Sequence, residues 1–213
     1  MADINNAVDF NSEHYLLINE VTSELQFKHT DWNKEELKEL RIYIREHYRR
    51  EQKSKCAYCK KDVSTTSALN CHVEHIAPKS KYKGYMFMPQ NLCVACADCN
   101  QIKNEKDTIH PLPKGKPRKR YPDSSSAFKI FHPHHDKYEE HIDIFKGRWY
   151  IDITDKGHFT IGACKLNQRS AEYGYDEANE FIELAESLIE AKRNKQKSLE
   201  RTIVKRIRVL LDE

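Results

Sequence analysis

The chain has 213 residues, with 36 basic and 33 acidic side chains and 38% hydrophobic residues. This composition excludes a fibrous or wholly disordered protein and allows one large domain or two small ones. No segment approaches the roughly 20 apolar residues of a transmembrane helix, and the acidic, polar start does not resemble a signal peptide. We therefore expect a cytoplasmic protein without membrane contact, whose seven cysteines indicate metal binding or catalysis before disulfides.

The small net charge of +3 conceals a strongly basic centre. Residues 53–120 carry 14 basic and 5 acidic side chains, a net of +9, and they include six of the seven cysteines. Basic charge gathered around possible metal ligands favours a polyanionic partner, most simply nucleic acid. A lysine-rich solvated surface is the plain alternative for the charge alone.

The N-terminal part is predicted to be an irregular lead-in followed by one helix. Residues 1–30 show no clear period, whereas apolar side chains recur at helical spacing across 33–52, after Asp31 or Asn33 as the cap. The apolar stripe consists of Leu37, Leu40, Ile44 and Tyr48. Three arginines share another face of the same predicted helix: Arg41, Arg45 and Arg49.

Two cysteine pairs follow this helix with the spacing of zinc ligands. Cys56-x-x-Cys59 and Cys96-x-x-Cys99 are separated by 36 residues, and each pair can bend the chain so that two thiolates reach one tetrahedral ion. Four thiolates make a closed site, which predicts a structural zinc that supplies folding energy. Cys93 forms an alternative pair with Cys96, so the spacing by itself leaves the second pair open.

The residues between and after these pairs carry a further pattern. Glu74-His75-Ile76-Ala77-Pro78 is followed by Asn91-Leu92, and the second pair continues as Asn100-Gln101-Ile102-Lys103. Together these motifs resemble the HNH endonucleases with a four-cysteine zinc, the ββα-metal nucleases, over 51 of the 213 residues. The resemblance selects Cys96/Cys99 as the second pair. Three cysteines then remain as ordinary buried thiols: Cys71, Cys93 and Cys164.

The resemblance also implies a role for each motif residue. Hydrolysis of a phosphodiester needs an activated water and neutralisation of the phosphate charge. His75 takes the position of the general base, and Glu74 and Asn100 take those of the ligands for Mg²⁺ or Mn²⁺. Asn91 stands where the family orders the loop that holds the histidine, and Lys103 is expected to contact phosphate. Glutamate instead of the more frequent aspartate at 74 lengthens that ligand by one methylene.

The segment 111–126 is rich in proline, glycine, serine and charge, and is predicted to be a loop or linker. Its five basic side chains are expected to bind the nucleic-acid backbone: Lys114, Lys116, Arg118, Lys119 and Arg120. The histidine cluster at 132–135 is interpreted as a support for neighbouring structure in preference to a metal site. His72 is interpreted as a packing or phosphate-side residue.

The last third is predicted to change from strands to helices. Alternating apolar residues over 141–163, with turn signals including Asp155-Lys156-Gly157, predict a three-stranded meander. Residues 176–213 are predicted to be helical, and the polar run 192–197 is either a break or a solvated stretch of one long helix.

Taken together, the sequence predicts an α+β protein with a ββα-metal HNH finger held by a four-cysteine zinc, flanking helices, a small antiparallel sheet and long C-terminal helices. Five segments are expected: an N-terminal lead-in and helix (1–52), an HNH nuclease core (53–110), a basic linker (111–126), a small β region (127–175) and a C-terminal helical segment (176–213).

The predicted function is a metal-dependent HNH endonuclease that hydrolyses nucleic-acid phosphodiester bonds, with DNA favoured. The alternative is a non-catalytic zinc-ribbon subunit that binds nucleic acid or serves as an adaptor. A narrower resemblance concerns the HNH subunit of Septu-type and retron-associated bacterial anti-phage systems, carried by Glu74-His75-x-x-Pro78-Lys79-Ser80 and the flanking segments. It implies an ATPase partner; the C-terminal helices equally suit a homodimer or packing onto the protein's own core.

Overall fold

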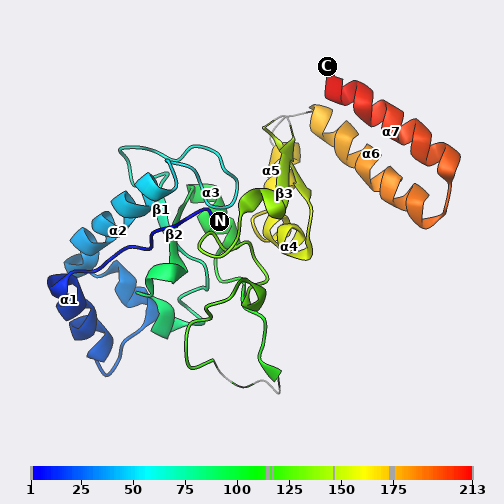
Figure 1. Cartoon of the computed structure of the whole chain (residues 1–213). Helices are drawn as coiled ribbons and strands as arrows, with labels where there is room; N and C mark the ends of the chain where they lie inside the picture. The colour runs from blue at the N-terminus through cyan, green and yellow to red at the C-terminus, as the bar shows by residue number, and fades with distance from the viewer. Residues whose placement is uncertain (1, 114–115, 117, 146, 173–175, 213) are drawn as a thin grey trace. The chain divides into compact units, whose positions relative to one another are not determined.

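The structure is a computed structural model that describes residues 2–113, 116, 118–145, 147–172 and 176–212 (Figure 1). Its α-helices are α1 (Ser12–Ser23), α2 (Lys38–Glu51), α3 (Ala97–Lys103), α4 (Asp155–Ala163), α5 (Leu166–Glu172), α6 (Asp176–Arg193) and α7 (Lys197–Asp212). Its strands are β1 (His72–His75), β2 (Leu92–Ala95), β3 (Ile142–Phe145) and β4 (Trp149–Asp152). Short 3₁₀ helices include η1 (His29–Asn33) and η2 (Glu35–Leu37). The predicted α+β class is confirmed.

The chain divides into two compact units. The first unit runs up to Asp143 and also contains Ile151–Lys165, whereas the second contains Ile144–Tyr150 and the chain from Leu166 onward. In the second unit, Asn167 bonds both the N–H and the carbonyl of Tyr150, each at 2.9 Å. Helices α6 and α7 pack along each other, so the polar run at 192–197 contains a break. Across the described residues, no helix has the length and apolar character needed to span a membrane.

The first unit contains a β-hairpin on which two helices pack. Strands β1 and β2 pair antiparallel, with Glu74 opposite Cys93 and His75 opposite Leu92. Helix α3 follows β2 directly and packs on β1, while α2 packs on both strands. This arrangement is the predicted ββα finger, with the predicted N-terminal helix against it.

The apolar stripe of α2 explains why this helix holds to the hairpin. Leu40, Ile44 and Tyr48 are buried, as predicted from their spacing. Burial of each of the two aliphatic side chains, Leu40 and Ile44, contributes roughly 1.5–3 kcal/mol. The Tyr48 hydroxyl accepts from the Val8 N–H at 3.0 Å and donates to the Pro89 carbonyl at 2.7 Å. Tyr48 therefore joins the N-terminal segment to the loop that precedes β2.

Two predictions for the N-terminal part were wrong. Residues 1–30 contain α1, which begins after Asn11, whose side chain accepts from the His14 N–H at 2.8 Å. Only Ile18 and Val21 of α1 are buried, so the apolar period was too short to be recognised. The expected cap before α2 is also displaced, because η1 and η2 precede it and Leu37 occupies its N-cap position.

The predicted third strand of the meander is a helix instead. The strands β3 and β4 are present, but the Thr154 hydroxyl then accepts from the Gly157 N–H at 3.2 Å and caps α4. The supposed turn at 155–157 is therefore the first turn of this helix. Its buried face is made of Gly157, Thr160 and Ala163, which are too small and too polar to produce a visible apolar stripe.

The close approach at Gly157 generates a test of this packing. A Cβ atom at Gly157 would lie 1.9 Å from the His141 carbonyl oxygen, which accepts from the Ile153 N–H. Gly157→Ala should therefore lower the free energy of unfolding by about 1–3 kcal/mol or more. Gly162→Ala is the matched control on the same helix, because a Cβ there meets nothing within 4 Å. The control should be neutral or stabilising by about 0.5–1 kcal/mol in denaturant unfolding. Equal effects of the two substitutions would contradict the packing.

Candidate functional site

The four cysteines of the predicted metal site come together. The Sγ atoms of Cys56, Cys59, Cys96 and Cys99 all lie within 4.8 Å of one another, and all four residues are buried. In the first turn the Lys60 N–H donates to the Cys56 carbonyl at 3.1 Å, with Lys60 at φ 57°. In the second turn Cys96 caps α3, and its Sγ accepts from the Cys99 N–H at 3.5 Å. The choice of Cys96/Cys99 over Cys93/Cys96 is confirmed.

The chemistry of this cluster fits a tetrahedral metal ion. Burial raises the pKa of the Cys56 thiol well above its ordinary value, so four thiolates can share this place only around a cation. Four sulfur donors in a closed arrangement are typical of structural sites. The other three cysteines, Cys71, Cys93 and Cys164, are buried thiols without a disulfide, as predicted.

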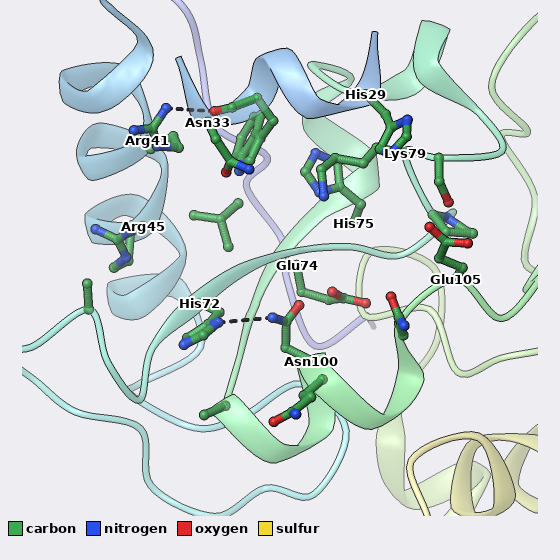
Figure 2. A pocket seen from close by; sticks show the side chains of 18 residues that line it. His29, Asn33, Arg41, Arg45, His72, Glu74, His75, Lys79, Asn100 and Glu105 are labelled. Carbon is green, nitrogen blue, oxygen red and sulfur yellow. Dashed lines mark hydrogen bonds between the residues drawn. The ribbon is translucent and has the colours of Figure 1, made fainter. Parts of the chain in front are cut away.

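A pocket of about 600 Å³ has walls from β1, α3, α2 and η1 (Figure 2). The structure brings together three predicted site residues here, because Glu74, His75 and Asn100 all line the pocket. All of the lining residues belong to the first unit.

The environment of His75 fixes the state of its ring. Nε2 lies 3.0 Å from the Met86 carbonyl, which can only accept, so Nε2 carries the proton and Nδ1 keeps a lone pair. The ring meets Trp32 edge-on, with 4.6 Å between centroids. Burial, together with the nearby Lys79 ammonium, lowers the pKa of His75 to about 3, against the opposing effect of the Met86 bond. The imidazole is therefore uncharged at neutral pH and can accept a proton.

Glu74 is held by Lys103, which was expected from the sequence to contact phosphate. The Lys103 ammonium lies 2.5 Å from Glu74 Oε1 and donates to the His75 carbonyl at 2.9 Å. The side chain of Lys103 is fully buried, so the expected contact with phosphate does not fit its place. The sequence put Lys103 on the correct helix, one turn beyond Asn100, but could not tell that its amine turns inward. Oε1 is thus engaged by Lys103, and the second carboxylate oxygen is the one that can serve a metal ion.

The orientation of Asn100 follows from a chain of hydrogen bonds. His72 Nε2 lies 3.0 Å from the Leu69 carbonyl, so it donates there and Nδ1 is an acceptor. Asn100 Nδ2 donates to that Nδ1 at 2.9 Å, as Figure 2 shows. The amide oxygen of Asn100 therefore remains available as a hard ligand. His72 is a positioning residue for Asn100, a role that the sequence interpretation did not specify.

Asn91 acts at a distance from the pocket, within the loops that support it. Its Oδ1 accepts from the Ala77 N–H at 2.7 Å, and its Nδ2 donates to the carbonyls of Ala77 and Tyr85. The side chain is fully buried and ties the end of β1 to the loop that carries Met86. Since Met86 holds the His75 ring, this geometry accords with the ordering role expected for Asn91.

Several pocket residues were missed because they lie outside the recognised motifs. Trp32 and His29 come from η1, and Arg41 and Arg45 come from α2. The helical spacing of the arginines signalled a shared face but not what that face would meet. No feature of the sequence near Trp32 indicates its contact with His75.

The predicted basic loop lies apart from the pocket lining. Lys116, Lys119 and Arg120 are exposed, whereas Arg118 is half-buried and donates to the His110 carbonyl at 3.3 Å. The Tyr85 hydroxyl contacts the carbonyl oxygens of residues 118 and 120 at 3.2 and 2.7 Å and anchors the loop. Lys114 lies outside the described residues. The role of the loop in nucleic-acid binding stays a prediction.

The histidine cluster at 132–135 is built into the framework around β2. His134 Nε2 donates to the Leu92 carbonyl at 2.8 Å, and buried His132 is bonded to the Tyr121 hydroxyl at 2.8 Å. Within the described part of the chain, only the four cysteines form a group of three or more potential His, Cys, Asp or Glu ligands. The supporting role inferred from the sequence agrees with these contacts.

Comparison with protein families places these residues in a known pattern. Residues 56–106 match the family model for HNH endonuclease. The span includes both cysteine turns and the four motif residues Glu74, His75, Asn91 and Asn100. Searches of curated proteins and of solved structures found no match. The N-terminal wall of the pocket lies outside the matched span.

The cysteine cluster makes a prediction about metal content. Purified protein should contain about one metal ion per chain at the four thiolates, and Cys56→Ser should lose that ion together with cooperative unfolding. Cys71→Ala is the matched control, because Cys71 is also buried but lies outside the cluster. Elemental analysis and thermal denaturation check both variants. A folded, fully loaded Cys56→Ser protein would rule out the assigned ligand set.

Proposed function

We propose, from the match of residues 56–106 to the HNH endonuclease model, that the protein is a metal-dependent endonuclease that hydrolyses phosphodiester bonds, with DNA as the favoured substrate. The observation that carries the proposal is the convergence of three groups in one pocket. An uncharged histidine, a buried carboxylate and an oriented amide oxygen come from His75, Glu74 and Asn100. Metal-assisted hydrolysis of a phosphodiester uses such a combination of a base and hard metal ligands.

Two metal sites with different tasks follow from the donor atoms. The cysteine cluster would hold a structural Zn²⁺, since four thiolates leave no open position. Glu74 and Asn100 would hold Mg²⁺ or Mn²⁺, which favour oxygen ligands and keep places for water and phosphate. When bound there, such an ion supplies neutralisation of the phosphate charge and of the leaving oxygen.

The chain's own residues account for the proton and for orientation. Nδ1 of His75 takes the proton from the attacking water, because Nε2 is committed to the Met86 carbonyl. That carbonyl then faces the protonated ring and stabilises its positive charge. Trp32 restrains the ring, and Lys103 fixes the carboxylate of Glu74.

The alternative function is a zinc-ribbon subunit that binds nucleic acid or a protein without turnover. Such a module requires the cysteine cluster but not a buried, uncharged histidine beside a carboxylate and an oriented amide. The pocket chemistry therefore favours hydrolysis. The placement in an anti-phage system with an ATPase partner rests on the sequence resemblance. The homodimer rests on the apolar stripes of the C-terminal helices, and the cytoplasmic location on the composition and the polar start of the sequence.

Loss of the base tests the proposal directly. His75→Ala should reduce nicking of supercoiled plasmid in Mg²⁺ or Mn²⁺ by about 100-fold or more, because the base acts in the transition state. Metal content and DNA affinity should change little. His158→Ala is the control, since this histidine of α4 is largely exposed and outside the pocket lining. The assay measures initial cleavage rates, alongside binding and elemental analysis.

A His75→Ala protein as active as the wild type would refute the assigned mechanism. Wild-type protein that binds DNA and metal but never cleaves it, with or without a co-purifying partner, would favour the binding-module alternative.

A further inference from the structure

The three arginines on one face of α2 have different surroundings. Arg49 is buried, pairs with Glu46 and donates to the Ser67 carbonyl, so it serves the fold. Arg41 and Arg45 instead line the pocket, on the wall formed by α2 (Figure 2). The proposed hydrolysis uses neither of these two arginines.

Arg45 lines the pocket without an ion pair to any carboxylate of the described residues. Its Nε donates to the Cys71 carbonyl at 2.9 Å, which anchors one edge of the guanidinium and leaves the two terminal nitrogens. Within the described part of the chain, neither Arg45 nor Arg41 lies within ion-pair distance of a carboxylate, and neighbouring Glu46 is engaged by Arg49. Burial lowers the pKa of Arg45, and the charges of Arg49 and Arg41 lower it further, against the opposing effects of Cys71 and Glu46. An anion in the pocket would relieve this repulsion.

Arg41 supports the same wall. One terminal nitrogen donates to the carbonyls of Trp32 and Lys34, at 2.6 and 2.8 Å. These bonds tie η1 to α2 and hold the guanidinium at the pocket. Its positive charge adds to that of Arg45 without a carboxylate to cancel it.

The two sides of the pocket differ in charge. The β1 and α3 side presents the oxygen ligands of Glu74 and Asn100, whereas the α2 side presents guanidinium groups. A guanidinium matches a phosphate in charge and in fork geometry. The pocket holds about 600 Å³, which is in the size range of sites for whole small ligands and exceeds the needs of one reacting phosphate.

We propose that Arg45, supported by Arg41, forms a subsite on α2 for a backbone phosphate that flanks the scissile one. The subsite rests on the proposed nuclease function and specifies how its substrate lies: the nucleic-acid strand continues from the metal ligands across the pocket to α2. The N-terminal segment therefore contributes to substrate binding, although it lies outside residues 56–106.

The contact between Arg45 and the flanking phosphate is tested by neutralising the arginine and the phosphate separately and together. The full chain carrying His75→Ala, which prevents cleavage, is titrated in Ca²⁺ with DNA oligonucleotides that bear one neutral methylphosphonate at successive positions. Arg45→Gln should weaken binding of unmodified DNA roughly tenfold and reduce the salt slope by about 1. Arg50→Gln is the control, because Arg50 is exposed on the same helix and outside the pocket lining.

Coupling between protein and DNA is the decisive result. With Arg45 intact, a methylphosphonate at one flanking position should weaken binding by a similar factor, and in Arg45→Gln that modification should cost little more. If Arg45→Gln is unstable, the scan with Arg45 intact still shows whether one flanking phosphate matters more than the others. Arg45→Lys should retain part of the affinity. An equal loss at all positions, or full additivity with Arg45→Gln, would overturn the subsite while leaving nuclease activity intact. Absence of both DNA binding and cleavage by the wild type would overturn the proposed nuclease function, and the subsite with it.

Discussion

The meeting of four cysteine sulfurs is the constraint on which the rest of the site depends. Two turns separated by 36 residues bring their Sγ atoms within 4.8 Å, and the β1–β2 hairpin is formed by the chain between them. Because Cys96 also caps α3, the ion that joins these turns would fix the start of that helix. Asn100 follows one turn later and Lys103 nearly two turns later. A structural metal would thereby determine where the ligands of a second, reactive metal stand.

The second feature of the site is the balance of charge around Glu74. Its pairing with buried Lys103 compensates the desolvation of the carboxylate, and removing either partner would leave an uncompensated buried charge. The same pairing reduces the negative charge available to a cation while it fixes the direction of the ligand. Lys103 thus orients Glu74 and His72 orients Asn100, and each of these two orienting residues is itself held by a backbone carbonyl.

The parts of the fold that could be predicted are those encoded by local motifs. The cysteine turns, β1, the α3 helix and the stripe of α2 all carry spacing that reflects their geometry. Helix α4 was predicted wrongly because its buried face is made of glycine, threonine and alanine. These residues produce neither the helical nor the strand period of apolar side chains. The inward turn of Lys103 was equally unpredictable, because it depends on a buried partner 29 residues away in the chain.

Only one side of the pocket could be predicted from the sequence. Its β1 and α3 side belongs to the HNH pattern, whereas its α2 and η1 side arises from packing between distant segments. Trp32 and Arg45 reach the site because Tyr48, Ile44 and Leu40 hold α2 against the hairpin. Single-sequence spacing identifies that helix face but does not determine what it will meet.

The most direct test of the central claim is X-ray anomalous scattering from crystals of zinc-loaded protein soaked in Mn²⁺, recorded at the absorption edges of both metals. We expect a zinc signal at the four cysteine sulfurs and a separate manganese signal between Glu74 and Asn100. A crystal with zinc at the cysteines and no manganese beside these two residues would contradict the proposed hydrolytic site.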